Sequence, residues 1–111
     1  MICVLPGETT KTVVVGAHFD HVDRGYGIVD NWSGAALLPN LLQWLESASR
    51  KHTFIFVGFT GEEGGLLGSD FYVRSLAKHD LENIESVVNL DTLGLGPTLV
   101  WLTQSDPLLV K

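Results

Sequence analysis

The first candidates for chemistry are a histidine and a carboxylate two positions apart. His18 and Asp20 lie in the segment GAHFDH, residues 16–21, and alternate side chains of an extended segment point the same way. A carboxylate so placed can accept the second ring N–H of a metal-bound histidine, which fixes the tautomer of the ring. Alone, such a pair more often consists of solvated polar residues, so it gains weight only from carboxylates elsewhere in the chain.

Carboxylates recur in three further motifs. Asp30 begins DNWSG, residues 30–34, where it serves either as a turn or helix cap or as a carboxylate shared between cations. Glu62 and Glu63 are neighbours between glycines, where they are either simply exposed or divide two tasks: one binds a metal while the other handles the proton of a bound water. Asp91 ends the run VVNLD and is either a turn cap or another ligand.

Apolar periodicity places these motifs at the ends of strands. The pattern predicts strands over residues 2–5, 12–17, 53–59, 86–90 and 99–102, and helices over 34–45 and 66–77. We expect the first two strands to form a hairpin, and Pro39 to kink the first helix or displace its start. The unbroken valine run 13–15 is typical of a strand covered on both faces.

This order of elements predicts an α/β fold. We expect a mixed, largely parallel twisted sheet with helices on both faces, arranged as a three-layer sandwich. Such sheets bind ligands beyond the carboxyl ends of their strands, which is where the histidine and the carboxylates fall.

The amino-acid composition limits the kinds of partner that this chain can bind. The 111 residues are 45% hydrophobic, which is enough for one core. Seven Lys and Arg against thirteen Asp and Glu give a net charge of −6, which disfavours nucleic acid as a partner. No apolar run approaches the length of a membrane span, and residues 1–6 do not form a signal peptide. We therefore expect neither nucleic acid nor a membrane as a partner.

The ordered motifs resemble those of the zinc-dependent metallopeptidases of family twenty-eight, which include bacterial leucyl aminopeptidases, glutamate carboxypeptidase and glutaminyl cyclase. The resemblance rests on VGAHFD (15–20) with DNWSG (30–34), on FTGEEGGLLGS (59–69) and on NLD (89–91), and it covers nearly the whole chain. It implies that the metal ligands are His18, Asp30, Glu63 and Asp91, with Asp30 bridging two Zn²⁺ ions. It also implies that Glu62 is the general base and that Asp20 orients His18.

The function implied by the resemblance is that of a zinc-dependent aminopeptidase, a metallo-exopeptidase. Its substrate is a peptide with a free N-terminus, whose first peptide bond is hydrolysed by a metal-bridged hydroxide with Glu62 as the base. Three alternatives stay open: a non-catalytic binding or assembly module of the same fold, a glutaminyl cyclase-like acyl transferase, and a peptidase that cuts at the carboxyl end.

The sequence also departs from the family pattern. The family completes its metal sites with a histidine downstream of the position of Asp91, and residues 92–111 contain none. We therefore expect two zinc ions by resemblance, with one or none as the alternatives, and an impaired activity. We expect residues 1–111 to form a single, incomplete catalytic domain whose uncovered sheet edge favours self-association. The resemblance favours a secreted or periplasmic compartment.

Overall fold

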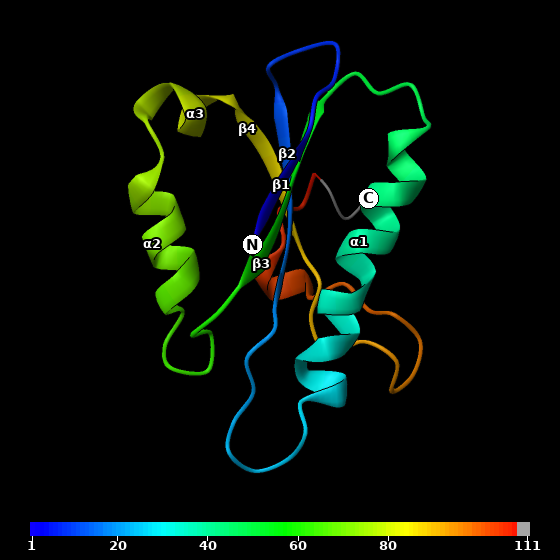
Figure 1. Cartoon of the computed structure of the whole chain (residues 1–111), viewed down its shortest axis with the longest axis vertical. Helices are drawn as coiled ribbons and strands as arrows, with labels where there is room; N and C mark the ends of the chain where they lie inside the picture. Colours follow the sequence, from blue (N-terminus) through cyan, green and yellow to red (C-terminus); the bar gives the residue numbers. More distant parts are fainter. Residues whose placement is uncertain (109–111) are drawn as a thin grey trace.

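The chain folds around one mixed sheet of four strands. The computed structural model describes residues 1–108. The strands are β1 (Ile2–Leu5), β2 (Thr12–His18), β3 (Thr53–Phe59) and β4 (Ile84–Asn89), in the order β1-β3-β2-β4 (Figure 1). β2 is parallel to both of its neighbours, and β1 is antiparallel to β3. The predicted α/β architecture with a mixed, largely parallel sheet is confirmed.

Helices cover both faces of this sheet. α1 (Ser33–Glu46) lies on one face, and α2 (Leu67–Ser75) and α3 (Lys78–Asn83) lie on the other (Figure 1). Val15 of β2 packs in a cluster with Leu38 of α1, whereas its neighbour Val14 packs with Tyr72 of α2. Successive side chains of a strand point to opposite faces, so a strand covered on both sides needs apolar residues at consecutive positions.

The predicted hairpin of the first two strands is wrong. β1 pairs with β3, in the register Ile2 to Val57 and Leu5 to Phe54, and not with β2. The reason is that β2 is the central strand: β3 and β4 pair with its two sides over most of its length, which leaves β1 the outer side of β3.

The helix boundaries and the last strand also differ from expectation. α1 starts at Ser33 and continues through Pro39, so its start is not displaced beyond the proline. The expected helix 66–77 is shorter, because Leu76 and Ala77 are extended, and α3 follows them. Residues 99–102 form no strand; they are exposed, and no described strand pairs with them. An apolar run alone does not make a strand without a partner.

Both edges of the sheet are open in the described part of the chain, and β1 pairs only with β3 there. β4 pairs only with β2 there, and its Val87 and Val88 are exposed. Self-association through an uncovered edge stays a prediction. Within residues 1–108, no helix combines the length and the apolar character that crossing a membrane requires.

The packing of α1 on the sheet predicts which of its side chains contribute to stability. Leu38 is 2% exposed and Leu37, its neighbour on the same helix, is 38% exposed. Leu38→Ala should lower the free energy of unfolding by about 2–4 kcal/mol, because it leaves a cavity in the core. Leu37→Ala should lower it by less than about 1 kcal/mol. Urea unfolding measures both, and equal losses would contradict the packing described.

Candidate metal centre

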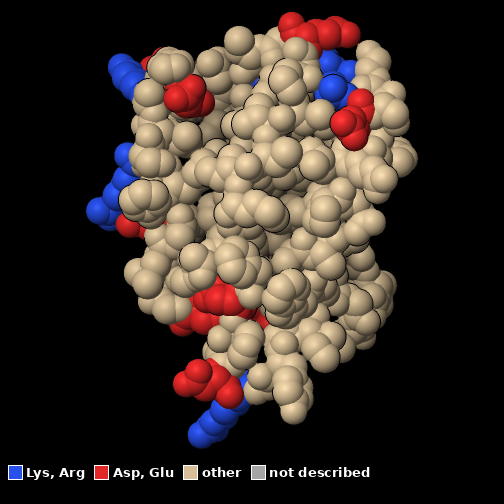
Figure 2. All heavy atoms as spheres, viewed as in Figure 1, with Lys and Arg blue, Asp and Glu red and all other residues tan. Residues whose placement is uncertain are grey.

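The centre is built on the carboxyl end of β2. His18 is the last residue of this strand, and it is only 3% exposed. It pairs in register with Phe59 at the end of β3, and the amide of Leu90, just after β4, donates to Gly16 of β2. The loops that follow three parallel strands therefore leave the sheet at the same end. Acidic side chains gather in the lower part of the space-filling view, at this end of the sheet (Figure 2).

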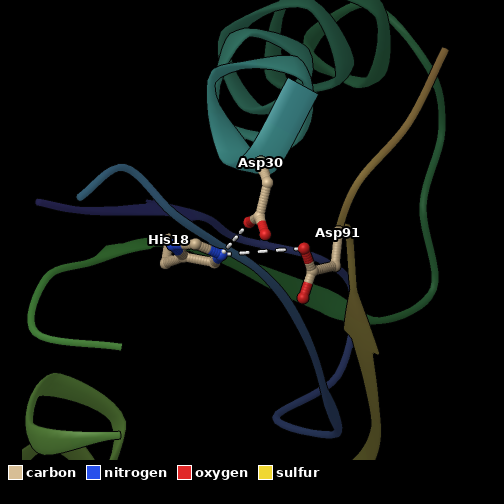
Figure 3. Close-up of side chains that lie close together, drawn as sticks. All are labelled: His18, Asp30 and Asp91. Carbon is tan, nitrogen blue, oxygen red and sulfur yellow. Dashed lines mark ion pairs between the residues drawn. The ribbon is translucent and has the colours of Figure 1, made fainter. Parts of the chain in front are cut away.

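The outer nitrogen of the imidazole faces carboxylates from all three loops. His18 Nε2 lies 3.0 Å from Asp30 Oδ1 and 3.6 Å from Asp91 Oδ1 (Figure 3). Glu62 Oε2 lies 3.9 Å from the same nitrogen. Ligand atoms of His18, Asp30 and Asp91 lie within 4.8 Å of one another, and so do those of His18, Glu62 and Glu63. The structure thus brings the expected residues together, while their roles as ligands stay predictions.

These separations fit a small cation. Two ligand atoms about 2.1 Å from a tetrahedral Zn²⁺ are about 3.4 Å apart. The distances of 3.0 and 3.6 Å from His18 Nε2 to Asp30 and Asp91 lie on either side of that value. One imidazole nitrogen and carboxylate oxygens are also ligand types that Zn²⁺ accepts in proteins.

The inner nitrogen of the imidazole is fixed by the backbone. His18 Nδ1 lies 3.2 Å from the carbonyl oxygen of Asp20. A carbonyl oxygen only accepts hydrogen bonds, so Nδ1 carries the proton and a neutral ring turns the lone pair of Nε2 toward the carboxylates. This is the tautomer that a metal ligand requires.

The carboxylate of Asp20 has a different partner from the one expected. Its Oδ1 is 3.6 Å from His18 Nδ1, which is long for a hydrogen bond. Instead, Oδ1 accepts the backbone N–H of Glu62 and Oδ2 accepts that of Glu63, each at 3.2 Å. Asp20 therefore holds the imidazole through its backbone and the two-glutamate turn through its side chain.

The charges of the centre shift the pKa values of its members. Burial opposes a charge on His18, but the carboxylates of Glu62, Asp91 and Asp30 outweigh it and raise the pKa of His18 above 6.5. Burial, together with repulsion from its acidic neighbours, raises the pKa of Glu62 above 4.5. Burial works against the charge on Asp20 too, yet the two amide hydrogen bonds lower its pKa below 3.8. Without a metal, the surrounding carboxylates therefore favour a proton on His18, and burial favours one on Glu62.

Two residues to which the sequence prediction gave no role at the metal centre connect its loops. Asn31 is fully buried, and its side chain contacts the backbone of residues 90 and 92 on either side of Asp91. Ser33 contacts the backbone of residues 29 and 93. A local signal existed for one of these contacts: Asn31 Oδ1 accepts the amide of Gly34 three positions on, which is the capping pattern considered for Asp30.

The model of Peptidase family M28 matches residues 1–107. The chain belongs to this family. The resemblance inferred from the three motifs is thereby confirmed.

Proteins with similar sequences are named as aminopeptidases. Over 88 residues the chain is 39% identical to the probable leucine aminopeptidase 2 of Arthroderma benhamiae, covering 79% of this chain and 18% of that one. It is 38% identical to an aminopeptidase of Pseudomonas aeruginosa, covering 79% and 16%. The chain thus spans less than a fifth of these curated relatives.

Solved structures support the fold. A zinc aminopeptidase from Bacillus subtilis superposes with a TM-score of 0.79 at 33% identity, covering 84% of this chain and 24% of that one. An aminopeptidase from Aneurinibacillus sp. strain AM-1 superposes with a TM-score of 0.81 at 26% identity, with the same coverage.

The raised pKa values predict how the stability of the metal-free M28 chain depends on pH. His18 and Glu62 hold protons to higher pH in the folded chain than in the unfolded chain, so stability falls as pH rises. The contribution of His18 is complete below its unfolded pKa of 6.5 and is lost as pH rises through the higher folded pKa. The shift of Asp20 has the opposite sign, but it acts only below pH 3.8.

Urea unfolding in EDTA measures this dependence. We expect a lower midpoint at about pH 8 than at about pH 5.5, and a smaller difference in His18→Gln, which cannot bind the proton. A wild-type midpoint that rises over this interval would show that the carboxylates do not surround the imidazole in solution.

Proposed function

We propose that this chain carries the metal centre of a zinc-dependent aminopeptidase. The observation that carries the proposal is the buried His18, whose Nε2 faces Asp30 and Asp91 while Glu62 lies beside it. Membership of Peptidase family M28 supports it, as do similar proteins named leucine aminopeptidase and zinc aminopeptidase. We further propose that residues 1–111 are part of a single, larger catalytic domain.

The donor set favours one complete zinc site. His18 Nδ1 is engaged by the backbone, so the imidazole has one nitrogen left and can serve only one ion. We assign that ion to His18, Asp30 and Asp91, because a catalytic zinc has three protein ligands and an open position. A second ion would use Glu63, with Asp30 as the shared carboxylate. That second set contains no imidazole from residues 1–111.

We assign Glu62 the role of the general base. A bound zinc ion lowers the pKa of water and polarises the scissile carbonyl. Glu62 lies 3.9 Å from His18 Nε2, and its raised pKa brings it closer to the pH at which it must accept a proton. Its backbone N–H is held by Asp20, which fixes where the side chain begins. In this role Glu62 takes the proton of water and returns it to the leaving amine.

The proposed substrate is a peptide with a free N-terminus. The cluster is acidic, and Asp91 and Glu63 are exposed at its surface, so a positively charged α-amine would be attracted there.

The adjacent glutamates provide a matched pair of variants. Glu62→Gln should lower the rate of hydrolysis about 10²–10⁴-fold while leaving zinc uptake nearly unchanged, because the base is lost and the ligands remain. Glu63→Gln should instead reduce the uptake of a second ion. Zinc content by mass spectrometry and initial rates separate the two effects. Equal loss of zinc in Glu62→Gln would refute its assignment as the base.

Blocked substrates test the proposed reaction. We expect the zinc-loaded chain to hydrolyse leucine amide and to leave N-acetyl-leucine amide intact. Hydrolysis of neither substrate by a zinc-loaded chain would contradict the aminopeptidase proposal and favour a binding module. Loss of ammonia from a peptide with an N-terminal glutamine would favour a cyclase.

A further inference from the structure

We propose that Asn31 is a positioning residue that sets the spacing between Asp30 and Asp91 across His18, with Ser33 as its helper. The inference rests on the proposed function, because it concerns the same metal centre. Asp30 precedes Asn31 in the chain, while Asp91 lies in a loop sixty residues away, so something must tie the two loops together.

The side chain of Asn31 forms hydrogen bonds with the backbone on both sides of Asp91. Its Nδ2 donates to the carbonyl of Leu90 at 2.8 Å, and its Oδ1 accepts the amide of Thr92 at 3.3 Å. These two peptide groups flank Asp91 directly. Asn31 directly follows Asp30 in the chain. Its buried side-chain amide therefore links the backbone that carries Asp30 to the backbone that carries Asp91, and both carboxylates face the imidazole.

Ser33 makes a second connection between the same two loops, through residues slightly further along the chain from Asp30 and Asp91. Its hydroxyl donates to the carbonyl of Val29, just before Asp30, and accepts the amide of Leu93, shortly after Asp91. The Ser33 hydroxyl also lies 3.4 Å from Asn31 Oδ1. The two side chains thus form one hydrogen-bonded unit between the loops.

The start of α1 is shaped around this unit. The amide of Gly34 donates to Asn31 Oδ1 at 3.0 Å. A Cβ atom on Gly34 would meet the carbonyl oxygen of Leu90 at 2.4 Å and Asn31 Oδ1 at 2.6 Å, which is too close. Only glycine at position 34 lets α1 approach the loop around Asp91 closely enough for the Asn31 side chain to reach both Leu90 and Thr92.

The need for such a device follows from charge. Asp30 and Asp91 are both exposed and both acidic, so the repulsion between their carboxylates opposes the close spacing seen across His18. Backbone anchoring through a buried amide keeps the loops in place before the metal arrives. Groups that orient metal ligands in this way typically change metal affinity by about 10–100-fold when they are removed.

The test compares Asn31→Ala with Asn40→Ala in the full chain, titrated with zinc in competition with a chelator. Asn40 also donates its side-chain N–H to a backbone carbonyl, that of Ala36 at 2.7 Å, but it does so on the exposed face of α1. We expect Asn31→Ala to weaken zinc binding about 10–100-fold and Asn40→Ala to leave it unchanged.

A double-mutant cycle with Asp91→Asn separates positioning from general stability. If Asn31 acts by placing Asp91, its effect on zinc affinity should shrink once that ligand is gone, whereas a purely structural role would give additive effects. Should Asn31→Ala fail to fold, Ser33→Ala is the second variant. Its control is Ser75→Ala, which removes a hydrogen bond from the Ser75 hydroxyl to the backbone carbonyl of Tyr72, far from the loops of the centre along the chain.

Two outcomes would overturn the inference in different ways. Equal zinc affinity of wild type and Asn31→Ala, or additivity in the cycle, would overturn it and leave the proposed function intact. A wild-type chain that takes up no zinc would overturn the proposed function itself, and the inference with it.

Discussion

The structure depends on balancing the charge around one buried imidazole. Carboxylates of Asp30, Asp91 and Glu62 surround His18 Nε2 within 3.9 Å, and they repel one another unless positive charge lies between them. In the metal-free chain these carboxylates favour a proton on the imidazole, and they raise the pKa of His18 despite its burial. A divalent cation supplies more positive charge, and the tautomer fixed by the backbone of Asp20 leaves Nε2 free to bind.

The loops that carry these charges are fixed by side chains bonded to backbone groups. Asp20 accepts two amides of the turn that begins with Glu62, and Asn31 holds both peptide groups next to Asp91. The sheet gives these loops a common starting point, because the parallel strands β2, β3 and β4 all have their carboxyl ends on the same side of the sheet. The rigid part of the centre is therefore the network behind the carboxylates, while the carboxylates themselves remain at the surface, where a substrate can reach them.

The sequence predicts the parts of this design that depend on local patterns. The consecutive valines before His18 indicate a strand buried on both faces, and the glycines around Glu62 indicate an acidic turn. It does not predict which strand pairs with β1, because pairing depends on competition for the sides of β2. Nor does it reveal the task of Asn31, whose partners lie sixty residues away. The carboxylate of Asp20 shows the same limit: its spacing from His18 suggested one partner, and the fold supplied two amides from a distant turn.

The most direct measurement is a zinc titration by calorimetry of the wild type, His18→Gln and His52→Gln. His52 is the matched control, since its Nε2 also lies beside a carboxylate, that of Glu85 at 2.8 Å, but with no second carboxylate paired to it in the described chain. The account predicts that wild type and His52→Gln bind zinc alike and that His18→Gln loses tight binding. Zinc binding by His18→Gln with the affinity of the wild type would contradict it.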